Sequence, residues 1–103
     1  MKVELDLFSG RPNPVWSLTE WEAFEFNEHL KTKSELPFKA IQNSNLGYRG
    51  FVVRDAIRIF EGVIWFENKV LLDASRELER FLLETGRQHL EAAVFELVLT
   101  QLM

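Results

Sequence analysis

Residues 51–72 read FVVRDAIRIFEGVIWFENKVLL, and this stretch decides the fold. Its β-branched and aromatic runs are separated by short polar or glycine-containing segments, which is typical of consecutive strands. Residues 54–56 and 67–69 are predicted turns, and residues 70–72 a short final strand. The Glu61-Gly62 pair predicts either a hairpin turn or a bulge within one long strand. We therefore expect an antiparallel meander in the middle of the chain.

The N-terminal residues 2–8 alternate between apolar and polar side chains. A period of two with one polar side predicts a half-buried strand. Glu4 and Asp6 fall on its polar side. Two carboxylates on one face can serve acid–base chemistry or hold a hard cation. The alternation alone already accounts for them as solvent-facing residues, and we favour that interpretation.

A loop of unusual composition follows, with the sequence FSGRPNPVW at residues 8–16. One glycine gives the backbone freedom, and two prolines fix φ at nearly adjacent positions, so the loop is predicted to be rigid. It presents Arg11 and Asn13 between the aromatic residues Phe8 and Trp16, as a binding loop would. The alternative, which we favour, is a structural connection whose Arg and Asn satisfy backbone carbonyls and cap the next helix.

The sequence Ser17-Leu18-Thr19-Glu20 predicts a capping box and a helix that ends near Lys31. A start two residues later is equally consistent, since Thr19 and Glu22 have the same spacing. Ala23, Phe26 and Leu30 form one apolar line of this helix, and Trp21 with Phe24 forms a second. The helix is therefore predicted to be deeply packed or to contact something on two sides.

Glu22, Glu25 and His29 share a polar stripe of the same helix. Such a set can contribute to a metal site, but one helix face rarely completes one, so we interpret it as a solvated face. Pro37 prevents the helix from continuing. Residues 38–46 combine one possible helical turn with Asn- and Ser-rich loop chemistry, and we expect the most mobile part of the domain there. Gly47-Tyr48-Arg49-Gly50 then predicts a bulge, a tight turn or a close backbone approach.

The C-terminal third predicts two helices. Asp73 is the expected N-cap of the first, and Gly86 its C′ residue. In this first helix, Glu79 and its charged neighbours are placed mostly on the side away from the apolar positions. The second starts near Arg87 or Gln88 and is apolar nearly all round, with Phe95, Leu99 and Leu102 on one line. Because a domain of this size rarely surrounds a helix completely, we expect a homodimer through these three residues.

Together these elements give the order β-α-β-β-β-α-α. The predicted fold is a single α+β domain over residues 1–103, with an antiparallel sheet of three to four strands and helices packed on it.

Composition excludes several functions. A net charge of −4 argues against nucleic acid as a partner, and the absence of cysteine excludes disulfides, thiolate catalysis and the usual structural zinc site. No apolar run is long enough for a membrane span, and the first residues lack the apolar segment of a signal peptide, so a soluble cytoplasmic protein is expected. We find no nucleophile-bearing turn, phosphate loop or metal cluster, and we predict no cofactor, no metal and no catalytic residues.

The loop at 8–14 (FSGRPNP) and the segment at 46–51 (LGYRGF) together resemble a group of small uncharacterised bacterial proteins that carry both motifs. The resemblance spans most of the chain in outline, with the helix from Asp73 to Gly86 following the motifs, but only the two loops are specific. It implies a stand-alone bacterial-type domain and supplies no activity and no catalytic residues.

Three functions follow from these patterns. The first is a non-enzymatic interaction or regulatory module, dimeric, in which residues 9–16 and 47–50 form one surface. The second is a small-anion or metabolite-binding domain that uses Arg11 and Arg49, with Trp16 and Tyr48 as apolar walls. For the arginines, internal ion pairs with acids such as Asp6 or Asp55 are the favoured alternative. The third is an acid–base enzyme with scattered carboxylates.

Overall fold

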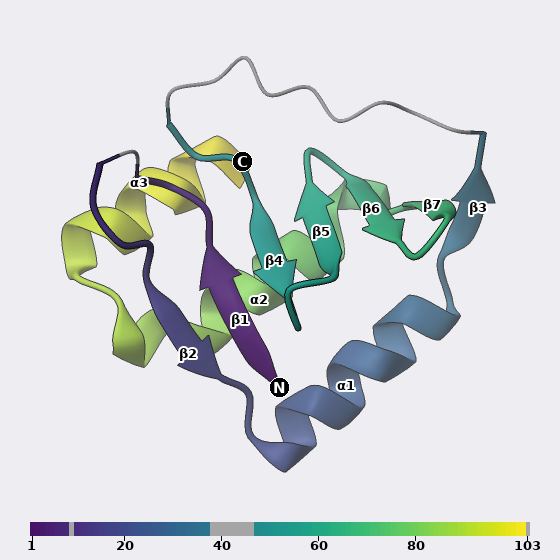
Figure 1. The fold of residues 1–103 in the computed structure, drawn as a ribbon, viewed down its shortest axis with the longest axis horizontal. Helices are drawn as coiled ribbons and strands as arrows, with labels where there is room; N and C mark the ends of the chain where they lie inside the picture. Colours follow the sequence, from purple (N-terminus) through teal and green to yellow (C-terminus); the bar gives the residue numbers. More distant parts are fainter. Residues whose placement is uncertain (9, 38–46, 103) are drawn as a thin grey trace.

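The computed structural model describes residues 1–8, 10–37 and 47–102, and it confirms the α+β class (Figure 1). All strand pairs are antiparallel in one seven-stranded sheet with the order β2-β1-β4-β5-β6-β7-β3. The strands are β1 (Lys2–Leu5), β2 (Val15–Ser17), β3 (Ser34–Leu36), β4 (Phe51–Val53), β5 (Ile57–Phe60), β6 (Val63–Phe66) and β7 (Lys69–Leu72). The helices are α1 (Glu20–Lys31), α2 (Glu77–Thr85) and α3 (Ala92–Leu102), with 3₁₀ turns at Ala74–Arg76 and Arg87–His89.

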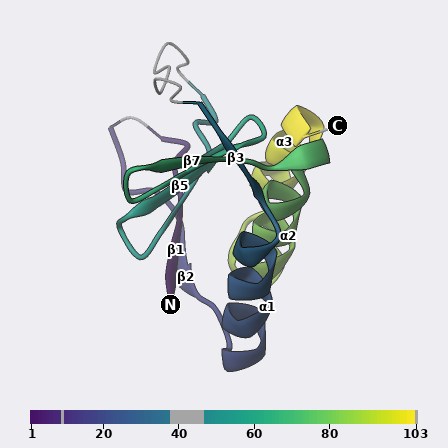
Figure 2. The same ribbon diagram turned by 90° about the vertical axis from the view of Figure 1, so that its right-hand side faces the viewer.

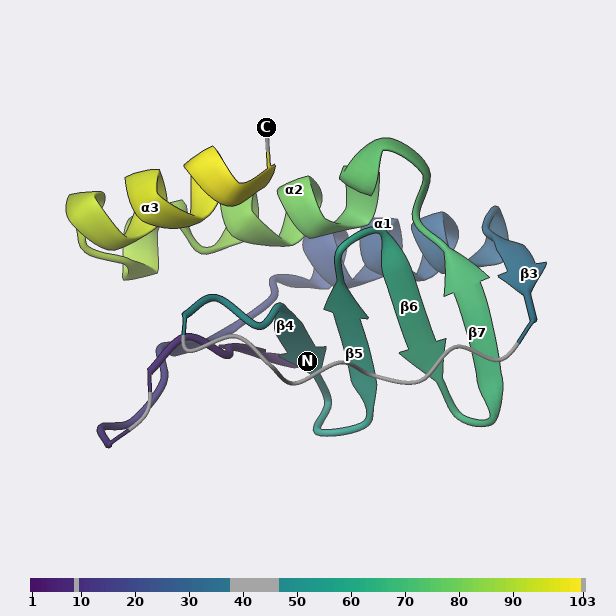
Figure 3. The same ribbon diagram turned by 90° about the horizontal axis from the view of Figure 1, so that it is seen from above.

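All three helices lie on one face of the sheet, so the molecule has two layers (Figures 2 and 3). The core lies between the layers. Its strand residues alternate with residues that face the other way, for example Ile57 and Ile59 on either side of Arg58. From the helices, Phe26 of α1, the leucines of α2 and three residues of α3 complete the core.

The meander at residues 51–72 is confirmed as four strands joined by tight turns. Glu61 and Gly62 both have positive φ, of 51° and 78°, and Phe60 pairs with Val63. This is the backbone geometry of a two-residue hairpin turn, so the bulged single strand is wrong. Lys69 belongs to β7 rather than to the turn before it.

The prediction of three to four strands and the order β-α-β-β-β-α-α are wrong, because the meander has four strands where the order allows three, and because two edge strands were missed. β2 and β3 each have only three residues. Three residues are too few for a period of two to stand out in the sequence. β2 is part of the predicted loop and pairs with β1, and β3 pairs with β7 at the opposite edge.

α1 begins at the later of the two predicted positions. Thr19 is the N-cap, and both hydrogen bonds of the capping box, between Thr19 and Glu22, are present. Ser17 lies in β2 instead and pairs with Lys2. The strand pairing of Ser17 therefore delays the helix until the chain has left the sheet.

Gly86 ends α2 close to the predicted C′ position, but as the C-cap residue and with a right-handed φ of −90°, so it does not use the left-handed conformation that favours glycine at C′. The reason for a glycine here is tertiary: a Cβ at this position would lie 2.5 Å from Cζ2 of Trp16. Gly50, by contrast, fulfils the predicted close approach. Its φ is +96°, and a Cβ there would lie 2.3 Å from the carbonyl oxygen of Ile59.

α3 packs against α2 and uses the side that was predicted for a dimer. Phe95 and Leu102 are only 4% and 2% exposed, and Leu99 is partly buried against the same core. The two buried residues are therefore corrected from interface to core residues. Leu97 is 51% exposed and is the large apolar side chain of α3 that remains exposed.

The segment 38–46, where the prediction was loop chemistry and mobility, lies outside the described residues. Within the described ranges, no helix is long and apolar enough to cross a lipid bilayer.

Candidate functional site

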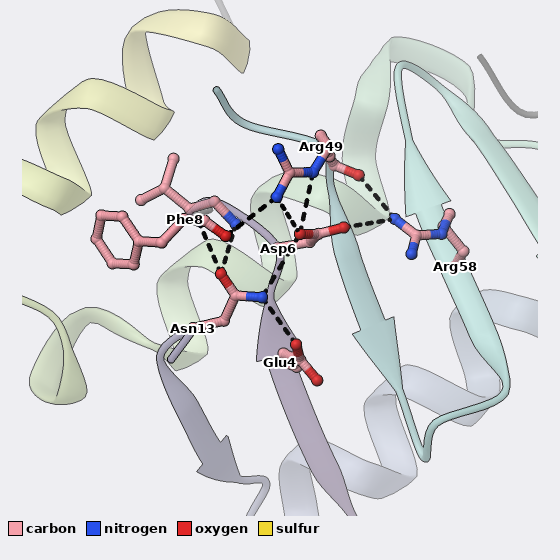
Figure 4. A network of polar contacts seen from close by, with 7 residues as sticks. Glu4, Asp6, Phe8, Asn13, Arg49 and Arg58 are labelled. Carbon is pink, nitrogen blue, oxygen red and sulfur yellow. Dashed lines mark hydrogen bonds and ion pairs between the residues drawn. The ribbon is translucent and has the colours of Figure 1, made fainter. Parts of the chain in front are cut away.

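Asp6 is the centre of a polar network on the sheet face opposite the helices (Figure 4). Its Oδ1 accepts hydrogen bonds from Nε and Nη2 of Arg49 at 3.1 and 2.9 Å, and its Oδ2 accepts one from Nη1 of Arg58 at 3.0 Å. The arginines also donate to backbone: Arg58 to the carbonyl of Arg49, and Arg49 to the carbonyl of Phe8. The network thus ties together the end of β1, the segment before β4, and β5.

Asn13 holds the predicted loop against this network. Its Oδ1 accepts hydrogen bonds from the backbone amides of Leu7 and Phe8 at 3.0 and 2.8 Å, and its Nδ2 donates to Oε2 of Glu4 at 2.9 Å. Asn13 therefore satisfies backbone amides rather than carbonyls, and it does not cap α1. Glu4 and Asp6, expected to face solvent, are both hydrogen-bonded within the protein.

Arg11 takes no part in the hydrogen bonds of this network. Its guanidinium carbon lies 3.8 Å from the centroid of the Phe8 ring, and the residue is exposed. The two arginines expected to bind an anion thus have different partners, an aromatic ring for Arg11 and a carboxylate for Arg49. The carboxylate of Asp6 neutralises the charge that an anion would need at Arg49.

Electrostatics within the network favour the ionised form of Asp6. Partial burial raises the pKa of this carboxyl group, but hydrogen bonds and charge interactions with Arg49 and Arg58 outweigh the burial and hold the pKa below its ordinary value. A carboxylate stabilised in this way is a poor proton acceptor near neutral pH. The geometry therefore suits cross-linking of the sheet better than acid–base chemistry.

Trp16, expected as a wall of a ligand site, is a core residue. Its Nε1 donates to Oγ1 of Thr85 at 3.0 Å, and its ring stacks on His89 with centroids 6.2 Å apart. The ring also contacts Phe51 edge-on. Trp16 therefore anchors the short edge strand β2 to the end of α2.

Tyr48, the other expected wall, is buried in a second polar cluster. Its hydroxyl donates to the carboxylate of Glu79, which also accepts hydrogen bonds from Arg76 at 3.0 and 2.9 Å and from the amide of Gly62 at 3.1 Å. Glu79 is fully buried, whereas the sequence placed it on the outer side of the helix. Arg76 lies only three residues from Glu79, but Gly62 and Tyr48 lie 17 and 31 residues away, so the sequence near Glu79 does not show that this residue is buried.

His29 of the predicted polar stripe contacts α2. Its Nδ1 lies 2.8 Å from Oε1 of Glu77, and Nζ of Lys33 lies 3.1 Å from the same oxygen. Nζ of Lys33 also lies 3.3 Å from Oδ1 of the buried Asp73. The carboxylate of Asp73 accepts hydrogen bonds from the backbone amides of Leu78 and Glu79 in the first turn of α2. Asp73 is not the N-cap of α2 as predicted, because a 3₁₀ turn over Ala74–Arg76 lies between them and Arg76 takes the N-cap position. Among the described residues, no group of three or more His, Asp or Glu side chains is placed to hold a metal ion.

The second apolar line of α1 is exposed. Trp21 and Phe24 stack with ring centroids 5.4 Å apart, and they are 65% and 53% exposed. Glu25 and Glu28 follow at i+4 and i+7 from Trp21, so these four residues share one helix face. We call them the aromatic stripe. It points away from Phe26, which packs in the core.

Comparisons with known proteins add no relative: no family model matches the chain, and neither curated proteins nor solved structures give a significant match.

Proposed function

We propose that this chain is a non-enzymatic protein-interaction module and that the aromatic stripe of α1 is its recognition surface. The observation that carries the proposal is the stacked pair Trp21 and Phe24, both more than half exposed. A single exposed apolar residue needs no explanation, but two adjacent aromatic rings on one helix face form a contiguous apolar patch. Trp in particular is enriched among residues that dominate binding energy at protein interfaces.

The two motif loops support the fold rather than this surface. Arg49 and Asn13 are committed to Asp6, to Glu4 and to backbone groups (Figure 4). Trp16 and Tyr48 are buried. The proposed interaction surface is therefore the aromatic stripe of α1 and not residues 9–16 and 47–50, because the α1 rings are available to a partner without any rearrangement of the core.

The test is selection of random 12-residue peptides on the immobilised protein, followed by affinity measurement with Trp21→Ala/Phe24→Ala. Selected peptides should bind the double variant at least tenfold more weakly than the wild type. Asn27→Ala changes an exposed residue of the same helix and serves as the control, with expected affinity within about twofold of wild type. Peptides that bind wild type and the double variant equally well would place the recognition surface elsewhere.

Self-association through α3 is a second proposal. A single exposed leucine does not establish an interface, but Leu97 is the position in α3 at which the proposal can be tested. This leucine is half exposed in a helix whose other large apolar residues are buried or partly buried. We expect sedimentation velocity to give a concentration-dependent dimer for the wild type and a monomer for Leu97→Glu. A wild-type monomer at the highest accessible concentration would remove this part of the proposal.

A further inference from the structure

We infer that the partner of the aromatic stripe is a basic peptide segment of another protein, and that one of its arginine or lysine side chains lies beside Phe24 among the glutamates. This inference rests on the proposed function and names the chemistry of the partner. Its basis is an open cavity of about 340 Å³ next to the stacked rings, which is lined by Phe24, Glu25, Glu28, His29, Thr32 and Glu77.

The lining of this cavity combines one aromatic face with three carboxylates. Glu77 already contacts His29 and Lys33, so Glu25 and Glu28 are the carboxylates that a ligand would use. A guanidinium group is attracted to an aromatic ring and can donate two parallel hydrogen bonds to a carboxylate, so both kinds of wall suit the same ligand group. The planar guanidinium of arginine meets both requirements better than the compact ammonium of lysine. A cavity that opens to solvent admits a side chain carried by a peptide backbone passing over Trp21.

The negative charge of α1 is only partly compensated within the protein. The helix has four glutamates and one lysine. Lys31 pairs with Glu28 at 2.8 Å, but the lysine side chain is 75% exposed, and such surface pairs contribute little and exchange readily. Among the described residues, Glu25 makes no ion pair. Like charges three residues apart repel one another on a helix, and a basic partner would relieve that repulsion.

A second copy of the chain is a poor occupant of the same surface. A symmetric contact through α1 would place its glutamates opposite those of the partner helix, which disfavours association. The net charge of −4 adds a long-range repulsion between copies. The stripe therefore fits a basic partner, and self-association would have to use another face such as α3.

The experiment extends the peptide selection with matched charge variants. Glu25→Gln/Glu28→Gln removes two charges beside Phe24, and Glu91→Gln/Glu96→Gln removes two exposed charges near and in α3, so both variants have the same net charge. Selected peptides should be enriched in arginine and lysine. Their affinity should fall at least tenfold in the α1 variant, by less than threefold in the α3 variant, and should weaken as salt is raised.

Each of the other possible results would overturn a specific part of the proposal. If the selected peptides require Trp21 and Phe24 for binding but carry no net positive charge, the inference of a basic partner is overturned and the proposed function remains. Equal losses in the two charge variants would assign the attraction to net charge rather than to this cavity, which also overturns the inference. If no selected peptide depends on Trp21 and Phe24, the proposed function fails and this inference fails with it. Circular dichroism and urea denaturation of every variant establish that its fold is intact.

Discussion

At the scale of single residues, Asn13 shows how one side chain shapes a loop. Its side-chain carbonyl oxygen accepts hydrogen bonds from the backbone amides of Leu7 and Phe8, two residues that follow the end of β1. Its amide nitrogen reaches Glu4 on the strand. The prolines on either side restrict the backbone, but it is Asn13 that fixes the loop to the sheet.

We predict that Asn13→Ala lowers the free energy of unfolding by about 1–3 kcal/mol, because it leaves partly buried backbone donors without acceptors. Urea denaturation measures the change. Arg11→Ala is the control from the same loop, and only its stacking on Phe8 is lost, worth about 0.5–1 kcal/mol. Equal stability of the two variants would show that Asn13 does not fix the loop.

Tyr48 is the single tyrosine of the chain, so tyrosine absorbance reports this residue alone. Burial, together with the neighbouring Glu79 carboxylate, raises the pKa of Tyr48 well above its ordinary value. We predict that the native protein shows no phenolate absorbance near pH ~10, where an exposed tyrosine would ionise. Phenolate should form only as circular dichroism reports unfolding. Reversible ionisation near that pH with an unchanged dichroism spectrum would contradict the buried Tyr48–Glu79 contact.

At the scale of elements, the joint between β2 and α2 depends on Gly86. The six-membered ring of Trp16 occupies the space where a Cβ would be, with three ring atoms within 2.9 Å of that position. The Trp16 indole also donates to Thr85, the last residue of α2. A short edge strand with few ladder bonds is thus held by one aromatic side chain.

We predict that Gly86→Ala destabilises the protein by about 1–3 kcal/mol through overpacking. Gly47→Ala is the control, since a Cβ at Gly47 meets no atom within 4 Å. Trp16→Phe removes the ring atoms that collide, so the cost of Gly86→Ala should largely vanish in that background. An undiminished cost in the double variant would mean that the strain lies in the backbone and not at Trp16.

At the scale of the whole molecule, the Asp6 network joins β1, β5, the segment before β4 and, through Asn13, the loop before β2. The helices pack on the opposite face, so this network stabilises the sheet where no helix covers it (Figures 2 and 4). Its central carboxylate has a lowered pKa because two arginines outweigh the effect of its burial. The stability of the sheet is therefore linked to pH.

A group with a folded-state pKa below its unfolded value contributes stability in full above the unfolded pKa and loses it as pH falls through the folded one. For an aspartate the unfolded value is about 3.9. We predict that wild-type stability falls with pH below about 5, and that Asp6→Asn is less stable near neutral pH but has a flatter profile in acid. Urea denaturation from pH 2 to 7 gives both profiles. Parallel profiles for wild type and variant would show that Asp6 does not carry this linkage.

The sequence by itself determined the elements that have a local signature. β-Branched runs with Gly- or Asn-containing turns gave the meander, Thr19 and Glu22 gave the start of α1 as one of two registers, and alternation gave β1. Each of these depends on residues within a few positions of one another, where strand and helix periods and capping bonds act. The sequence also indicated Trp21 and Phe24 as a second apolar line, but it did not predict that this line is exposed.

Only the tertiary structure decided which of those residues are buried and by what. β2 and β3 are three-residue segments that become strands because each pairs with a strand edge that would otherwise be unpaired, β2 with β1 and β3 with β7. Glu79 is buried because Tyr48, Arg76 and Gly62 converge on it, and Gly86 is required because Trp16 arrives from 70 residues earlier. Contacts between distant segments leave no periodic signal in a single sequence, because each partner alone is compatible with an exposed position. The fold class was therefore predictable, whereas the network at Asp6 and the open face of α1 became apparent only once the chain was packed.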